Sequence, residues 1–461
     1  MRPRCRSMSR SRARRSSAKR GRSEFVAIGS VTGVSPPAAA LALVLIYARY
    51  YSNTLEYAIT PTRSISKMSA SQPPSPISKS KARAAVAAIF FLNGFGFASW
   101  VSRIPAVRQA LNLTDGALGT ALLATAVGAL VAFPLTGRGS VVSGARTLTI
   151  ATGLAYCVVL PGPTFASGLT TLALLLFFFG ATNGAMDVSM NALAVEVETY
   201  VGKPIMSSFH GMWSIGGLAG AGVGALFAKH DISPQLHLVV VASILTVAIV
   251  AARHWLPPSQ SHPSPESVAH FARPESAMFG LSGIIFCAFL IEGAMADWSA
   301  VLLHDSLHTT AASAALGYAA FSLAMTSMRF AGDRLGIKWG AVRLLRSTNV
   351  VAAVVFAAAL WVQHVGLTMV AFALIGFGMA TVAPLVFGAA ARRARHGAGH
   401  GIAAMATVGY GGFLVGPPLV GWLAQASSLR AALSVIAVLA MAITVLAHHL
   451  REPAPEGAFE K

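Results

Sequence analysis

The sequence predicts an all-α membrane protein in which 12 transmembrane helices form two pseudo-symmetric six-helix bundles. Hydrophobic residues make up 55% of the 461 residues and charged residues only 11%, whereas soluble domains carry about 25% charged residues. The chain also contains a series of long apolar segments, and its two halves resemble each other. Because a water-soluble fold cannot bury so much apolar surface, we expect the lipid bilayer to be its solvent.

The apolar segments have the length needed to cross a bilayer and lie between charged or Pro/Gly-rich breaks. They cover residues 84–102, 116–136, 146–164, 167–194, 205–228, 235–254, 278–303, 312–331, 342–362, 366–389, 402–424 and 428–449. The longest break divides them into two sets of six. We therefore expect bundles at 83–256 and 278–450, a cytoplasmic linker at 257–277 and a tail at 451–461.

Residues 1–82 are expected to form a basic, disordered extension before the first bundle. Residues 1–67 contain 13 Lys and Arg against 2 acidic residues, a large part of the net charge of +19. Their Arg/Ser-rich composition is typical of a solvated tail or of contact with anionic lipid, so we expect no nucleic-acid partner. Met68 is an alternative start, because a short polar leader and the first strong helix follow it directly.

The orientation follows from the charges in the loops, because Lys and Arg resist translocation. Counted from Lys79 with the N-terminus inside, the cytoplasmic segments hold 18 Lys and Arg and the opposite side holds 4. This split predicts that both termini are cytoplasmic.

The two halves share a repeated pattern with a constant offset in residue number. Phe91, Leu92, Ala98, Trp100 and the run Ala117–Gly119 recur as Phe289, Leu290, Ala296, Trp298 and the run Ala315–Gly317. This constant offset indicates a duplicated six-helix unit with parallel halves.

Two short loops carry a family resemblance. After the eighth segment, Gly332-Asp333-Arg334-Leu335 is followed by Gly340 and Arg343, and the loop after the second segment keeps Gly137-Arg138-Gly139 and Gly144-Ala145-Arg146 without the acidic residue. With twelve segments in two sixes, these loops resemble the signature loops of the major facilitator superfamily. The resemblance implies a secondary transporter with a cytoplasmic gate formed by Arg138, Arg146, Arg329, Asp333 and Arg334.

Further runs resemble a bacterial branch near the fucose permeases. They are Trp100–Pro105, Asn183–Asp187 with Asn191, Phe209–Ser214 and Gly416–Pro418. Fucose-type symporters use carboxylates on segments one and four, and Asp187 matches the second. The first segment offers only Asn93, so sugar specificity is not implied. The resemblance places the chain in a bacterial inner membrane as a proton-coupled, monomeric carrier of a small solute.

Ionisable side chains within apolar segments mark the candidate site, because each costs about 2.5–3.5 kcal/mol at a helix centre on insertion scales. Asn183, Asp187 and Asn191 are four residues apart and form a polar stripe that should face the bundle interior. It is either a solute or proton site or a fixed contact between helices. His210 in segment five is either its proton-relay partner or a structural histidine.

Segment seven contributes Glu292 near the middle of the membrane and Asp297 further out. Five residues place them about 140° apart on a helix, so we expect Glu292 to line the site and Asp297 to pair near the rim. Trp213 is a further candidate for solute contact, whereas Trp100 and Trp298 are expected to anchor at the membrane interface.

Other function classes remain as alternatives. A multidrug or metabolite efflux antiporter fits the same pattern. A lipid-modifying enzyme would need a clustered nucleophile or metal ligands, and a non-transporting sensor would need an appended soluble domain; the sequence shows neither. We therefore expect no enzymatic activity, no cofactor and no metal.

Overall fold

The computed structural model describes residues 77–203, 205–258, 272–395 and 397–451. The predictions for most of the basic extension, including Met68, for most of the 257–277 linker and for the tail beyond residue 451 lie outside these residues. The side chains of Asp333 and Arg334, two of the expected gate residues, also lie outside the description.

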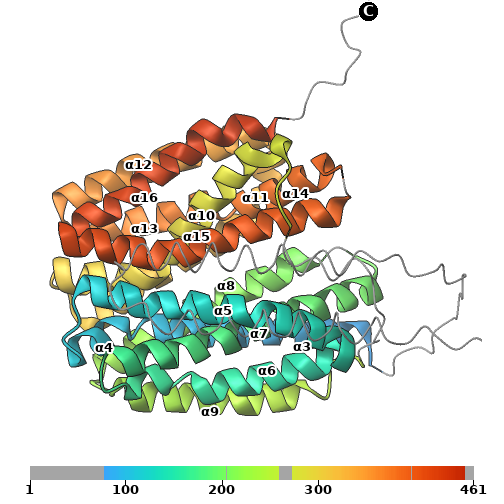
Figure 1. Ribbon diagram of the computed structural model, residues 1–461, viewed down its shortest axis with the longest axis horizontal. Coiled ribbons are helices and arrows are strands. Elements are labelled where there is room, and N and C mark those ends of the chain that lie inside the picture. The colour runs from blue at the N-terminus through green and yellow to red at the C-terminus, as the bar shows by residue number, and fades with distance from the viewer. Residues whose placement is uncertain (1–76, 204, 259–271, 396, 452–461) are drawn as a thin grey trace, which may run out of the picture. The chain divides into compact units, whose positions relative to one another are not determined.

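Two groups of helices form separate bundles, blue to green and yellow to red in Figure 1. The first contains α3 (Lys79–Val101), α4 (Ile104–Ala110), α5 (Asp115–Ser143), α6 (Ala145–Val159), η2 (Gly162–Phe165), α7 (Leu169–Val201), α8 (Met206–Lys229) and α9 (Pro234–Ala252). The second contains η4 (Ser276–Met278), α10 (Phe279–Val301), the π-helical η5 (Leu302–Ser306), α11 (Ala311–Trp339), α12 (Ala341–Val362), α13 (Val365–Met379), α14 (Val382–Arg393), α15 (Ala398–Ala426), α16 (Leu429–Leu446) and η6 (Ala447–Leu450).

These helices provide 12 segments that are long and apolar enough to cross a membrane within the described residues. The predicted all-α membrane fold is confirmed. Several segments are built from two consecutive elements, such as α3 with α4 and α13 with α14.

The two bundles repeat the same local structure. Helix α5 begins at Asp115 and α11 begins at Ala311, and each is 29 residues long. We call the step in residue number from Asp115 to Ala311 the helix-start offset; it is close to the offset of the sequence repeat. Thr114 and Thr310 cap these helices by accepting a bond from the backbone N–H three residues on, which satisfies a donor that the first turn leaves open.

Each of these helices also ends at a glycine with positive φ. Gly144 has φ 79° and ψ 144°, and Gly340 has φ 79° and ψ 143°. Because side chains disfavour this conformation, glycine permits the chain to turn directly into α6 or α12.

A pair of glycines sets an equivalent close packing inside each bundle. A Cβ on Gly180 of α7 would collide with the backbone carbonyl of Thr125 on α5, and one on Gly376 of α13 would collide with that of Phe321 on α11. The helix-start offset relates the two glycines and also the two carbonyls, so the two bundles share one scaffold in packing as well as in order.

The main contacts between the bundles are those of α8 with α11 and of α5 with α15, and α3 also contacts α10 and α11. The short helix α4 also contacts α10. The expected interfacial positions of Trp100 and Trp298 are wrong: their exposed fractions are 2% and 0%. Both indoles lie in the apolar core because the segments that carry them are among the most buried of the fold.

Candidate functional site between the bundles

A buried amide links three helices of the first bundle. The side chain of Asn93 on α3 donates from Nδ2 to Oδ1 of Asn183 on α7 at 3.0 Å, and its Oδ1 accepts from Nε1 of Trp213 on α8 at 2.8 Å. Asn93 is only 2% exposed. Three residues expected at the site therefore lie together, and the Asn93 amide fixes the positions of the two half-buried side chains.

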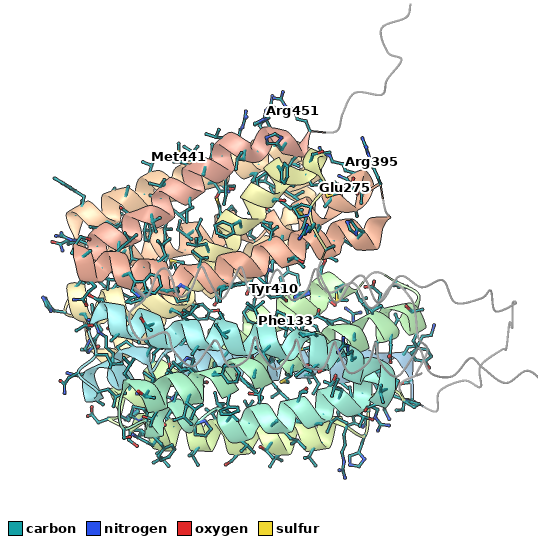
Figure 2. The ribbon with its side chains drawn as sticks, viewed as in Figure 1. Phe133, Glu275, Arg395, Tyr410, Met441 and Arg451 are labelled. Atoms are coloured by element: carbon teal, nitrogen blue, oxygen red, sulfur yellow. The ribbon has the colours of Figure 1, made fainter. Side chains whose placement is uncertain are left out.

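The carboxylate of Asp187 lies one turn further along α7 and connects the two bundles. Its Oδ1 accepts from Nδ2 of Asn191 at 3.1 Å, and its Oδ2 accepts from the hydroxyl of Tyr410 on α15 at 3.2 Å. The Tyr410 ring packs on Phe133 of α5 with a centroid separation of 4.6 Å. Figure 2 labels both residues where the two bundles meet. No ion pair reaches Asp187 from the residues that the structure describes.

The structure shows no contact between Asp187 and His210 of the kind that the proton-relay hypothesis requires. Asp187 bonds Asn191 and Tyr410, whereas the His210 ring packs edge-on against Phe90 at 5.4 Å. His210 is exposed, and its backbone carbonyl accepts from Nη1 of Arg329 at 3.4 Å.

Arg329, one of the expected gate residues, lies against α8. Its Nη1 donates to the Ser214 hydroxyl at 2.6 Å. The guanidinium also attracts the carboxylate of Glu292 on α10 without forming a direct ion pair. Arg329 therefore joins α8, α10 and α11 at the interface of the bundles.

Glu292 and Asp297 are both half-buried on α10. Neither forms a hydrogen bond or ion pair with another described residue, yet both interact electrostatically with Tyr318 of α11. The two carboxylates were expected about 140° apart around the helix, yet both have Tyr318 as a neighbour. Tyr318 also packs against Phe97 of α3 at 6.5 Å, which brings this group to the first bundle.

The remaining gate residues with described side chains, Arg138 and Arg146, lie in the first bundle. Arg138 is exposed near the end of α5, and Nη2 of Arg146 donates to the carbonyl of Arg253 at 2.8 Å. That contact stays within the first bundle.

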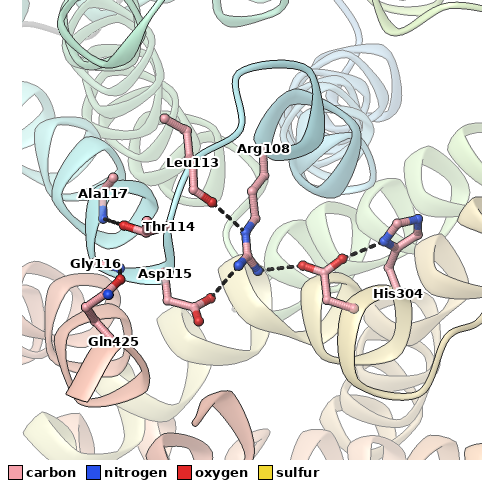
Figure 3. Close-up of polar contacts among 9 residues, drawn as sticks. Arg108, Leu113, Thr114, Asp115, Gly116, Ala117, His304 and Gln425 are labelled. Atoms are coloured by element: carbon pink, nitrogen blue, oxygen red, sulfur yellow. Dashed lines mark hydrogen bonds and ion pairs between the residues drawn. The ribbon is translucent and has the colours of Figure 1, made fainter. Parts of the chain in front are cut away.

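Four ionisable residues that the sequence analysis did not select join the bundles at one end (Figure 3). We call them the Arg108 cluster: Arg108, Asp115, His304 and Asp305. Arg108 pairs with Asp115 at 2.9 Å and with Asp305 of the other bundle at 2.5 Å, and His304 Nδ1 lies 2.6 Å from Asp305. A signal existed in the sequence, because Arg108 and Asp305 follow equivalent segments of the repeat.

Neutral contacts continue the same junction along α5 and α15. The Gly116 N–H donates to Oε1 of Gln425 at 3.4 Å, and Nε1 of Trp422 donates to the Thr120 hydroxyl at 3.1 Å. The bundles are therefore tied by the Arg108–Asp305 ion pair at this end and by the hydrogen bonds Asp187–Tyr410 and Arg329–Ser214 deeper inside.

Comparison with known proteins identifies the family. The model of the Major Facilitator Superfamily matches residues 86–411 and 281–461. The chain belongs to this superfamily. Its members are transporters, and the fold with 12 membrane-capable helices agrees with that assignment; the chain is a multi-pass membrane transporter.

Curated relatives of the chain align over most of their own length. The uncharacterised transporter y4wD of Sinorhizobium fredii is 36% identical over 80% of this chain and 97% of its own. The membrane protein MosC of Rhizobium meliloti is 35% identical over 77% of this chain and 86% of its own.

Solved structures share the fold at low identity. The nucleoside transporter NupG matches with a TM-score of 0.59 and 13% identity over 79% of this chain and 98% of its own. A bacterial homologue of the lysosomal transporter Spinster, in an inward-facing and occupied conformation, matches with a TM-score of 0.61 and 12% identity over 83% and 97%.

Proposed function

We propose that this superfamily member carries a small hydrophilic solute together with protons by alternating access, and that Asp187 is the proton-carrying group. The observation that supports this most is the Asp187 carboxylate, which lies in a membrane segment, without an ion-pair partner among the described residues, on a hydrogen bond between the two bundles. A carboxyl group within a membrane segment is typical of proton pathways.

The bonds of Asp187 link its protonation to the contact between bundles. An ionised carboxylate accepts hydrogen bonds from Tyr410 and Asn191, and charge-assisted bonds of this kind are roughly twice as strong as neutral ones. Protonation removes the charge and turns one oxygen into a donor, which weakens the bond to Tyr410. A proton on Asp187 would thus loosen the bundles at this point.

The side chains that we assign to the site favour a polar solute. Asn183 and Asn191 offer amide groups, Glu292 offers a carboxylate with no hydrogen bond among the described residues, and the Trp213 ring offers an apolar face. Binding sites for small molecules combine aromatic side chains with a few polar groups that orient the ligand.

The alternating-access step requires the Arg108 cluster to break. With both termini cytoplasmic, as the loop charges predict, this cluster lies at the outer end of the bundles. In the proposed cycle, the outer end opens when the Arg108–Asp305 pair separates and the site then faces outward. We propose that the carrier works as a monomer in the bacterial inner membrane.

The test uses purified protein in proteoliposomes. A thermal-shift panel of sugars, polyols and amino acids first selects a stabilising solute, whose labelled form is then followed. For Asp187→Asn we expect no uptake driven by a pH gradient, while exchange of labelled for unlabelled solute persists. The matched control is Asp231→Asn, an exposed carboxylate outside the site, which should behave as the wild type.

An Asp187→Asn protein that accumulates solute with unchanged pH dependence would refute the proton role. The direction of the gradient that drives wild-type movement also separates symport from the efflux antiport that the sequence left open.

A further inference from the structure

A basic hollow of about 530 Å³ lies at one end of the second bundle, where α11, α12, α14 and η6 come together. It is lined by Trp339, Gly340, Ala341, Val342, Arg343, Arg346, Arg392, Leu450 and Arg451. The short helix η6 contacts both α12 and α14, so the hollow is part of the packed fold. None of the residues assigned to the solute site takes part in it.

Four guanidinium groups surround this hollow, and its lining contains no acidic residue. Arg343, Arg392 and Arg451 are exposed, whereas Arg346 is half-buried and held by a bond from its Nε to the Thr444 carbonyl at 3.2 Å. Guanidinium groups bind the oxygens of phosphate and carboxylate groups through pairs of parallel hydrogen bonds, so such a group of arginines is suited to a phosphate anion.

The backbone adds donors at the same place. Helix α12 begins at Ala341, and its N-cap Gly340 has no side chain to occupy the open N–H groups of the first turn. Ala341, Val342 and Arg343 of that turn line the hollow. The open N–H groups and the helix dipole therefore favour an anion here, in addition to the arginines.

The first bundle lacks this concentration of charge at the corresponding positions. By the helix-start offset, Arg343 corresponds to Thr147, Arg346 to Ile150 and Arg392 to Glu196. The general preference for cations at cytoplasmic helix ends applies to both bundles, so it does not explain why three arginines of the hollow stand where the first bundle has Thr147, Ile150 and Glu196.

The surroundings favour a ligand that belongs to the membrane. Trp339 is 48% exposed at the end of α11, and Leu450 completes an apolar part of the lining. Tryptophan is enriched at the level of lipid headgroups, and basic pockets between transmembrane helices bind anionic headgroups. Figure 2 shows Arg451 at the end of the bundle that also carries Arg395.

We propose that this hollow binds the headgroup phosphate of an anionic phospholipid. The arginines and the first turn of α12 hold the phosphate, while Trp339 and Leu450 lie against the apolar part of the lipid.

Native mass spectrometry of the full chain with added phosphatidylglycerol or phosphatidylcholine tests this proposal. The variant Arg343→Gln with Arg392→Gln removes two exposed charges from the hollow. Because each cation near an anionic lipid surface contributes on the order of 1 kcal/mol, we expect it to bind phosphatidylglycerol at least about tenfold more weakly than the wild type. Binding of phosphatidylcholine should be weak in both proteins.

The control variant, Lys229→Gln with Arg430→Gln, removes two exposed charges outside the hollow and should retain phosphatidylglycerol as the wild type does. Equal loss in both double variants, or none in either, would overturn the site. Inorganic phosphate forms a further arm. If it binds the wild type while phosphatidylglycerol does not, the hollow is a site for free phosphate and the lipid proposal is wrong.

Discussion

The two bundles place different side chains at corresponding positions of one scaffold. Where α5 meets α15, Phe133 packs on Tyr410; where α11 meets α8, Arg329 donates to Ser214. By the helix-start offset, Phe133 is equivalent to Arg329, and Ser214 is equivalent to Tyr410. The contact between equivalent helices is therefore aromatic between α5 and α15 and charged between α11 and α8. The backbone packing repeats in the two bundles, whereas the side-chain chemistry does not.

The polar side chains diverge in the same way. By the helix-start offset, Asn183 and Asp187 correspond to Met379 and Ala383, so the second bundle has no counterpart of the polar stripe on α7. Glu292 and Asp297 of the second bundle lie on α10 instead. We infer a division of labour in which the first bundle carries the proton and the second contributes charge to the solute site.

The shared scaffold is tested most severely at the paired glycines. Gly180→Ala and Gly376→Ala each force a Cβ into a backbone carbonyl of the neighbouring helix, and overpacking of this kind costs about 1–3 kcal/mol. We expect both variants to lose thermal stability by similar amounts, measured as the unfolding midpoint in detergent. Gly222→Ala on α8 is the control, because a Cβ there meets nothing within 4 Å. A large loss in one bundle only would mean that the two bundles are not equivalent in packing.

The division of labour is tested at Glu292. We expect Glu292→Gln to weaken solute binding at least about tenfold, equivalent to about 1.4 kcal/mol, while uptake keeps its dependence on the pH gradient. Titration of the solute by thermal shift gives the first quantity and proteoliposome uptake gives the second. If Glu292→Gln instead removes the pH dependence, the proton role belongs to the second bundle.

The junction between the bundles is tested at Asp305. The Arg108–Asp305 pair is partly exposed, with 18% and 32% of the side chains accessible, so its loss should cost about 1 kcal/mol or less. We expect Asp305→Asn to raise the population open at this end by up to about fivefold. Spin labels at Ala110 and Ala311 report it as a longer distance. Unchanged distances would show that the pair does not hold this end closed, and Asp231→Asn serves as the control.

The helix caps give the smallest expected difference. Thr114→Ala and Thr310→Ala each remove one capping bond, worth about 0.5–1 kcal/mol at an exposed helix start. Equal small decreases in the unfolding midpoint are expected. A decrease in only one variant would indicate that the caps serve different purposes in the two bundles.

Much of the scaffold could be predicted from the sequence, because the length of apolar segments and the spacing of the repeat act locally. The pairing of Asn93 with Asn183 and Trp213 could be predicted in part from the sequence, because each residue lies in a membrane segment and polar groups in such segments avoid lipid. The contact of Asp187 with Tyr410 could not, because it depends on how α7 and α15 face each other across two bundles. The same is true of the contact between Arg329 and Ser214, because it depends on how α11 and α8 face each other across the two bundles.

Infrared difference spectroscopy of the carboxyl groups tests the central claim without knowledge of the solute. As the pH falls, wild-type protein should gain a protonated-carboxyl band that is absent in Asp187→Asn and shifted in Tyr410→Phe, because Tyr410 is bonded to that carboxyl group. A band that persists unchanged in Asp187→Asn would show that the proton is carried by another residue.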